Sequence, residues 1–379
     1  MAGYLVRCPL GGYAWQTAHY LLGLRALGHD VWFYEDTGHY TPAYNPMTGE
    51  HGAAYDYGTA AVAEFLGRVG CGDRWVFVDV HAGREYGPGA GRAAALLREA
   101  DLLVNLSGVN RIPPERRGGR PAAYIDLDPG YTQLGLANGD TALKAILDEH
   151  AQLFTLGENI GTARSPIPTS GYTWHPTRQP IVIGFWADAG PPGPAYTTVG
   201  KWSSDDRRVT YRGQAYGWSK RAEWERYLDL PVRAGATFEL AMNVGGDDLD
   251  RLDAHAWRVV DPIGVSADPW CYRDYVRRSR GEFTVAKDMN VRLRSGWFSD
   301  RGACYLAAGR PVVMQDTGYG DVLPLGAGLH AVSSVDEAAE AIRAIEGDYA
   351  RASAHASEVA RECFAADQVL GRLLGTLGW

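Results

Sequence analysis

Residues 281–324 read GEFTVAKDMNVRLRSGWFSDRGACYLAAGRPVVMQDTGYGDVLP, and this stretch is the most informative about the fold. Its apolar pattern predicts a strand at Phe283–Ala286, a helix at Ser299–Ala308 and a second strand at Pro311–Gln315. Gly309 ends the helix in a tight turn, a position that favours glycine. A strand, a helix and a strand in this order are the repeating unit of a parallel sheet covered by helices.

The loop before this helix has the features of an anion site. Ser295, Gly296 and Ser299 are small, so a ligand can approach the backbone closely at the start of the helix. Free N–H groups and the helix dipole favour negative charge at such a terminus. Three arginines could supply the counter-charge: Arg292, Arg294 and Arg301. We therefore expect a diphosphate to bind here.

The N-terminal segment shows the same alternation. Strands are predicted at Tyr4–Cys8 and Val31–Tyr34, with a helix at Trp15–Leu27 between them and Gly11-Gly12 in the first loop. A continuous apolar strand after a short turn implies a parallel pair joined by a right-handed crossover. Because strands and helices continue to alternate in both halves of the chain, the fold class is α/β.

The chain is long enough for two domains, at 379 residues. The periodicity stops between Thr162 and Gln179, where three prolines and two serines fall, and this break indicates a linker. We expect an N-terminal domain at 1–165, a linker at 166–179 and a C-terminal domain at 180–355. A closing helix at 356–379 is expected to pack back on the N-terminal domain.

Residues 281–324 resemble the donor-binding segment of GT-B glycosyltransferases. Ala307–Val313, AAGRPVV, matches the family's turn from helix to strand. Gln315-Asp316 stands where many inverting members place an Asp-Gln pair that contacts the donor sugar, here in reversed order. Retaining members often carry a ribose-binding glutamate at the position of Cys304, so this sequence departs from the retaining pattern.

The N-terminal half carries a second resemblance. Leu10–Tyr13, LGGY, is similar to the family's first loop, whose glycines face the donor across the cleft. The dinucleotide motif GxGxxG is absent from the first loop, which disfavours a nicotinamide-dependent dehydrogenase.

Lys201, in the expected C-terminal domain, is similar to the cations that reach a donor phosphate from loops of this family. The alternative is an ordinary surface lysine.

The resemblance implies two Rossmann-like domains that face a cleft. It also implies a glycosyltransferase of the hexosyltransferase type, which moves a sugar from a nucleoside-diphosphate sugar to a hydroxyl acceptor such as a small natural product. The alternatives are a sugar-nucleotide epimerase or hydrolase of the same fold, and a non-catalytic protein that binds nucleotide sugars. The implied donor-binding residues are Gly11, Gly12, Lys201, Ser295, Gly296, Ser299, Arg301, Gln315 and Asp316.

An inverting transfer needs a base at a strand end that faces the cleft. Glu158, Asp128 and His19 are the candidates, and each has a structural alternative as a cap, a turn residue or a helix histidine. The spacing Asp126-x-Asp128 also resembles the metal-binding pair of the other large glycosyltransferase fold. The two-domain pattern argues against that fold, so we expect no metal and no cofactor beyond the nucleotide sugar.

Composition limits the partners. The net charge is −8 and no basic face is visible, so no nucleic-acid partner is expected. The five cysteines are scattered without metal-binding spacing, and neither a signal peptide nor a run of ~18 apolar residues is present. We therefore expect a cytoplasmic protein without a membrane span, and the sequence leaves a homodimer open.

Overall fold

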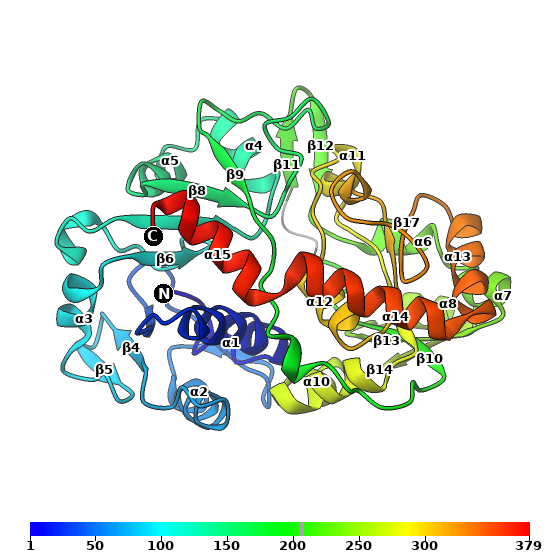
Figure 1. Ribbon diagram of the computed structural model, residues 1–379, viewed down its shortest axis with the longest axis horizontal. Coiled ribbons are helices and arrows are strands. Elements are labelled where there is room, and N and C mark those ends of the chain that lie inside the picture. Colours follow the sequence, from blue (N-terminus) through cyan, green and yellow to red (C-terminus); the bar gives the residue numbers. More distant parts are fainter. Residues whose placement is uncertain (205–207) are drawn as a thin grey trace.

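The computed structural model describes residues 1–204 and 208–379, which form two α/β halves that lie side by side (Figure 1). The halves are joined by two crossings of the chain, one after β9 (Trp174–Pro176) and one at the C-terminal helices. Both faces of the C-terminal sheet are covered, because Val312 and Met314 join one buried cluster and Val313 joins another. This burial explains the continuous apolar runs of the sequence.

The N-terminal sheet consists of two groups of strands, β5-β4-β1 and β6-β7-β8-β9. Ala2 joins them, since it pairs in parallel with both Tyr34 and Asn105. All pairs are parallel except β4 with β5. The strands are β1 (Phe33–Asp36), β4 (Trp75–Asp79), β5 (Arg84–Tyr86), β6 (Leu103–Leu106), β7 (Ala122–Asp126), β8 (Gln152–Thr155) and β9, with β2 (Ala43–Asn45) and β3 (Glu50–Gly52) in a separate hairpin. The helices are α1 (Gly11–Ala26), α2 (Asp56–Arg68), α3 (Ala93–Glu99), α4 (Tyr131–Ala137) and α5 (Thr141–Asp148).

The strand predicted at Tyr4–Cys8 is wrong, because the chain bends there. The N–H groups of Leu5 and Val6 each donate to one carboxylate oxygen of Glu35 at 2.7 Å, and the N–H of Arg7 donates to the other at 3.0 Å. Glu35 is fully buried and needs these donors. The three amides are therefore unavailable for strand pairing.

The C-terminal sheet is entirely parallel, with the strand order β14-β13-β10-β15-β16-β17. The chain builds the sheet outward from β10 in one direction and then outward from β15 in the other, so the order reverses between these two strands. The predicted strand, helix and strand of residues 281–315 are confirmed as β15 (Gly281–Thr284), α12 (Asp300–Ala307) and β16 (Val312–Gln315). The other strands are β10 (Ala195–Gly200), β13 (Thr237–Met242), β14 (Trp257–Val260) and β17 (Leu329–Val332), with β11 (Arg208–Tyr211) and β12 (Gln214–Gly217) in a hairpin. The other helices are α6 (Arg221–Glu225), α7 (Leu230–Ala234), α8 (Asp247–Ala254), α9 (Pro262–Ser266), α10 (Pro269–Arg278), α11 (Asp288–Arg292) and α13 (Val335–Gly347).

The segment predicted as a linker at 166–179 is partly ordered sheet. β9 lies within it and pairs in parallel with β8, from Leu153 opposite Trp174 to Thr155 opposite Pro176. The irregular chain between the two sheets therefore begins after Pro176 rather than at residue 166.

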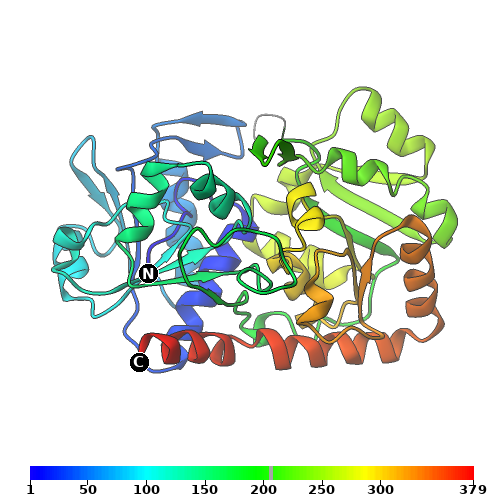
Figure 2. The same ribbon diagram turned by 90° about the horizontal axis from the view of Figure 1, so that it is seen from above.

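The last helices connect the two halves. Figure 2 shows α14 (Tyr349–Val359) and α15 (Ala366–Leu377) running end to end beneath both halves. A π-helical segment, Ala360–Phe364, separates them. There the first crossing pairs with the second, because the N–H of Ile181 donates to the carbonyl of Phe364 at 2.7 Å. α15 then packs against α1 of the N-terminal half.

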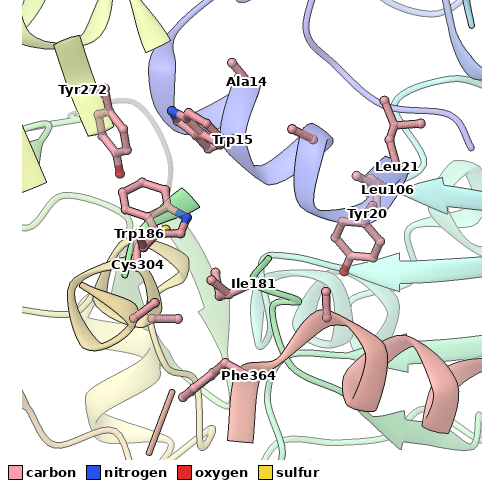
Figure 3. Packing of buried hydrophobic residues seen from close by; sticks show 14 of the residues in the cluster. Ala14, Trp15, Tyr20, Leu21, Leu106, Ile181, Trp186, Tyr272, Cys304 and Phe364 are labelled. Atoms are coloured by element: carbon pink, nitrogen blue, oxygen red, sulfur yellow. The ribbon is translucent and has the colours of Figure 1, made fainter. Parts of the chain in front are cut away.

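A shared aromatic core fills the junction of the halves (Figure 3). Trp15 of α1 contacts Trp186 of the first crossing with ring centroids 5.4 Å apart, and Trp186 contacts Tyr272 of α10 at 6.4 Å. The indole N–H of Trp15 donates to the carbonyl of Pro269 at 2.6 Å. Because all three rings are almost completely buried, separating the halves would expose a large apolar area.

None of the helices in residues 1–204 and 208–379 combines the length and the hydrophobicity that crossing a bilayer requires.

The contact between α1 and α15 depends on Gly23. A Cβ atom at this position would lie 2.5 Å from Cδ1 of Leu370 and 2.9 Å from Cβ of Ala366. We predict that Gly23→Val lowers the free energy of unfolding by about 2 kcal/mol, because the clash pushes the helices apart. Gly371→Ala in α15 is the control: its Cβ meets nothing within 4 Å, so it should stabilise the helix slightly. Equal thermal midpoints for wild type and Gly23→Val would contradict the packing described here.

Candidate functional site

The carboxyl ends of β10 and β15 are held together by Arg301 at the start of α12. Its guanidinium donates to the carbonyl of Val199 at 2.5 Å and to the hydroxyl of Thr284 at 3.0 Å. Its Nε donates to Glu282 at 2.5 Å. Since the strand order reverses between β10 and β15, Arg301 lies at the point where open α/β sheets bind their ligands.

Glu282 supplies the counter-charge for this arginine. The carboxylate is fully buried, and its Oε1 also accepts a hydrogen bond from the Thr198 hydroxyl at 3.1 Å. Its Oε2 has no partner among the described residues. Burial opposes the charge of Arg301, but the attraction of Glu282 outweighs it and raises the pKa of the guanidinium. The arginine is therefore fixed in place and remains charged.

Three lysines surround the same strand ends. Lys201 follows β10 and is exposed, Lys287 follows β15, and Lys220 precedes α6. Burial lowers the pKa of Lys220 to about 7, and repulsion from Arg301 and Lys287 adds to the shift. Lys220 therefore lies buried beside two other cations, with the carboxylates of Glu282 and Asp300 opposing part of the shift.

Lys220 could not be predicted as a site residue from the sequence. It follows Ser219 in a stretch without a motif, and only the tertiary structure brings it beside α12. The side chain lies near Trp297, with its Nζ 5.8 Å from the ring centroid. Lys287 has a similar contact, with its Nζ 3.1 Å from the ring centroid of Trp218. Aromatic rings therefore line the cationic region, whereas Trp202 is buried in the core against Trp224.

The N-terminal half faces these cations with Asp128. Its carboxylate lies 2.8 Å from Nζ of Lys287, and the side chain is 47% exposed. This ion pair joins the loop after β7 to the loop after β15, so it spans the space between the halves. Asp128 is the one predicted catalytic residue that meets the cations directly.

The start of α1 also lies on the side of the N-terminal half that faces the C-terminal half. The helix begins at Gly11 with no side-chain cap, and a Cβ at Gly11 would lie 2.4 Å from Cβ of Tyr272 in the C-terminal half. The glycine therefore allows the two halves to approach closely. Tyr13 is 44% exposed, yet burial raises its pKa, and Cys8 and Asp128 add to the rise.

The predicted phosphate loop has a different role in this structure. Ser295 is completely buried, and its carbonyl accepts the N–H of Asn159 from the N-terminal half at 3.0 Å. The N–H of Gly296 donates to the carbonyl of Thr317 at 2.8 Å, and a Cβ at Gly296 would lie 2.8 Å from the Asn159 nitrogen. Ser299 caps α12 by accepting the N–H of Gly302. The N–H of Ser295 donates to the carbonyl of Asn290 at 3.2 Å. The loop therefore forms a seam between the halves, and the prediction of free amides at Ser295 and Gly296 is wrong.

The Gln315-Asp316 pair is also engaged. Gln315 is 1% exposed; its side-chain carbonyl accepts the N–H of Ala286 at 3.1 Å and its amide donates to Glu223. Asp316 accepts the N–H of Gly318 at 2.7 Å and pairs with Arg294 at 3.2 Å. Both side chains hold the loop after β16 in place. Gln315 is therefore unable to contact a donor sugar, although the sequence predicted such a contact.

Two catalytic candidates are less suited to act as a base than Asp128. His19 is 1% exposed, and its ring nitrogens face the N–H of Val182 at 3.1 Å and the indole N–H of Trp186 at 3.0 Å. Burial lowers its pKa to about 3, so the ring stays neutral in the core. Glu158 is bound by the guanidinium of Arg178 through two contacts, at 2.7 and 3.1 Å. His19 is therefore a core residue. Glu158 is only 14% exposed in its pair with Arg178, whereas Asp128 is 47% exposed in its pair with Lys287, so Asp128 is the more accessible carboxylate.

Asp126 is a structural carboxylate rather than half of a metal-binding pair. Its oxygens accept hydrogen bonds from Thr132 and Gln133 at 2.8 Å, from Thr155 at 2.9 Å and from the N–H of Asp128 at 3.3 Å. Burial raises its pKa to about 6, although the hydrogen bonds oppose the shift. The side chain ties β7, α4 and β8 together, so it does not point at a ligand with Asp128.

Known structures share this architecture. HepE from Anabaena, solved with UDP and glucose, is 11% identical, with a TM-score of 0.55 over 100% of this chain and 98% of that chain. An α-glucosyltransferase solved with UDP and a 13-mer DNA is 8% identical, with a TM-score of 0.58 over 100% and 98%. AviGT4, a glycosyltransferase of avilamycin A biosynthesis, is 11% identical, with a TM-score of 0.50 over 96% and 88%. No protein-family model matches the sequence, and no curated protein matches it significantly. The chain therefore has the GT-B fold, with two Rossmann-like domains that face a cleft.

The ion pair of Arg301 and Glu282 yields a stability prediction. Arg301→Met should lower the free energy of unfolding by about 3 kcal/mol, because it leaves a buried carboxylate without a counter-charge. Adding Glu282→Gln to the same chain should restore at least half of that loss. Arg294→Met is the control, since its partners are partly exposed and its effect should stay below about 1 kcal/mol. Denaturant unfolding that shows additive losses in the double variant would contradict the coupling.

Lys220 yields a pH prediction. Its pKa is 10.5 in the unfolded chain and about 7 in the folded protein, so the folded state disfavours the proton. This cost is fully present below pH 7 and disappears as the pH rises toward 10.5. Lys220→Met should therefore raise the free energy of unfolding by at least about 1 kcal/mol at pH 6, with little gain near pH 10. Thermal midpoints measured across this range would contradict the burial of Lys220 beside two cations if the variant were destabilised at pH 6.

Proposed function

We propose that this protein is a glycosyltransferase of the hexosyltransferase type, which moves a sugar from a nucleoside-diphosphate sugar to a hydroxyl acceptor. One observation carries the proposal: four cations gather where the strand order of the C-terminal sheet reverses, opposite a carboxylate of the other half. They are Lys220, Lys287, Arg301 and Lys201, which follows Gly200, where a Cβ would lie 3.8 Å from Nη1 of Arg301; the carboxylate is Asp128.

The cations fit a diphosphate. A leaving nucleoside diphosphate gains negative charge as its bond to the sugar breaks, and fixed positive groups stabilise that charge. Arg301 is held by two strands and a glutamate, so its position does not change when a ligand arrives. HepE and the α-glucosyltransferase were solved with UDP, which supports a nucleotide-sugar donor for this chain. The DNA of the second complex is not part of the proposal, because this chain carries a net charge of −8.

Asp128 is the proposed base. In the transfer, the acceptor oxygen bonds to C1 of the sugar while the bond from C1 to the phosphate oxygen breaks. The electron pair of the broken bond leaves with the diphosphate, and the acceptor proton passes to the carboxylate of Asp128. Because Asp128 contacts Lys287, base and leaving group would share one lysine, which brings the reacting groups to the same place.

The proposal includes metal independence, a small-molecule acceptor and a cytoplasmic location. Positive side chains at the site can neutralise the negative charge of the diphosphate, a role that a divalent ion would otherwise fill. The five cysteines are unpaired in the structure, and this state is typical of a reducing compartment.

Asp128→Asn separates binding from chemistry. We predict that turnover with an acceptor falls at least about 100-fold, because the amide cannot accept the proton. Calorimetry should show that the nucleoside diphosphate binds as tightly as in wild type or more tightly, since Lys287 loses its competing carboxylate. Parallel losses of affinity and turnover would contradict the assignment of Asp128 as base.

Product analysis tests the reaction class with the same samples. Wild-type protein should transfer the sugar only when an acceptor is present and should keep this activity in excess chelator. Rapid release of free sugar from the donor alone would indicate a hydrolase, and a change in the donor sugar would indicate an epimerase. Donor binding without turnover on any acceptor would indicate a binding protein.

A further inference from the structure

Three tyrosines form a cluster on the N-terminal half at the cleft. The rings of Tyr4 and Tyr13 lie with centroids 6.0 Å apart at 77°, and those of Tyr4 and Tyr40 lie 6.2 Å apart at 58°. Tyr13 and Tyr40 are each 44% exposed, which is unusual for large aromatic side chains in contact with one another. We call Tyr4, Tyr13 and Tyr40 the tyrosine platform.

The platform is held from beneath by a buried arginine. The guanidinium of Arg7 lies 4.8 Å from the ring centroid of Tyr4 and donates to the backbone carbonyl of Tyr40. Arg7 is completely buried and pairs with Glu35 at 2.8 Å. One side chain therefore holds the ring of Tyr4 and the backbone of Tyr40, which limits the freedom lost when a ligand binds. The charge of Arg7 is neutralised, and the exposed rings present a neutral surface.

The platform lies next to the proposed reaction centre. Tyr13 lies in the first turn of α1, two residues after Gly11, and a Cβ at Gly11 would lie 2.4 Å from Cβ of Tyr272 in the C-terminal half. Burial raises the pKa of Tyr13, and Cys8 and Asp128 add to the rise. A molecule resting on the rings would thus lie at the edge of the N-terminal half that faces the C-terminal half.

We propose that the tyrosine platform binds the acceptor and that the acceptor is a neutral sugar, so that the transfer joins two sugars. This inference rests on the proposed function. A pyranose ring presents C–H groups on its faces and hydroxyls around its rim, and tyrosines offer an apolar ring and a polar tip to match. Burial raises the pKa of Tyr4 and of Tyr13, so their hydroxyls remain protonated donors.

The ring geometry separates this acceptor from a flat one. A planar polyphenol stacks best between parallel walls, whereas the platform rings meet at 77° and 58°. The cation directly beneath these rings, Arg7, is buried and paired with Glu35, so it offers no charge to an acidic acceptor. The geometry of the rings therefore favours a carbohydrate over a planar acceptor.

The test compares variants of the intact protein with two groups of acceptors. The first group is neutral disaccharides (cellobiose, maltose and lactose) and their p-nitrophenyl glycosides, and the second is planar flavonoids. Wild type should release nucleoside diphosphate faster with members of the first group. Tyr40→Ala and Tyr13→Ala should raise KM for the sugar about tenfold, and Tyr13→Phe should retain more of the affinity than Tyr13→Ala. Trp379→Ala, which removes an exposed aromatic at the C-terminus, should behave as wild type.

Calorimetry with UDP, GDP, dTDP and ADP on the same variants distinguishes the two proposals. The nucleotide that wild type binds should bind Tyr40→Ala with a dissociation constant within about twofold. If a nucleotide binds but flavonoids alone serve as acceptors, no sugar serves, or Tyr40→Ala keeps the wild-type KM, the carbohydrate platform is overturned while the donor site stands. If no nucleotide binds at all, the proposed function itself fails.

Discussion

The buried carboxylate of Glu282 is the constraint on which the site depends. A charge in the interior of a sheet needs a counter-charge, and Arg301 supplies it from the first turn of α12. The same guanidinium holds the carboxyl ends of β10 and β15, so the start of α12 is fixed at the point where the strand order reverses. Lys220 then lies close to Arg301 and Lys287; burial lowers its pKa, and repulsion from both cations adds to the shift. A buried amine beside other cations lowers stability, and such groups are typical of a binding site.

The relative position of the halves is fixed by packing rather than by the site. Trp15, Trp186 and Tyr272 fill the junction, and α15 returns to cover α1. On the other side of the cleft, Asn159 binds the loop at Ser295. The cleft is consequently set with Asp128 opposite the cations before any ligand binds, and such prior placement of reacting groups contributes to catalysis.

Local sequence patterns predicted the parts of the fold that depend on local burial. The strand, helix and strand of residues 281–315 follow from apolar periodicity, and Gly309 marks their turn. The strand predicted at Tyr4–Cys8 failed because a distant carboxylate, Glu35, binds its amides. In the site, Asp128 and Lys287 could be found at strand ends, but Lys220 reaches the cations only through the tertiary fold. Gly296 was predicted to allow another group to approach the backbone closely. A group does approach, but it is the chain at Asn159 rather than a phosphate.

The most direct test of a nucleotide-sugar site is thermal stabilisation by ligands. The thermal midpoint of unfolding would be measured with UDP, GDP, dTDP and ADP sugars, with NAD as the control. A ligand that binds only the folded state raises the free energy of unfolding by RT ln(1 + [L]/Kd), and the midpoint rises with it. We expect one nucleotide-diphosphate sugar to stabilise the protein selectively, and Lys287→Met to lose most of that shift. No shift with any nucleotide sugar, or a shift with NAD alone, would contradict the assignment of the cations at the start of α12 as a diphosphate site.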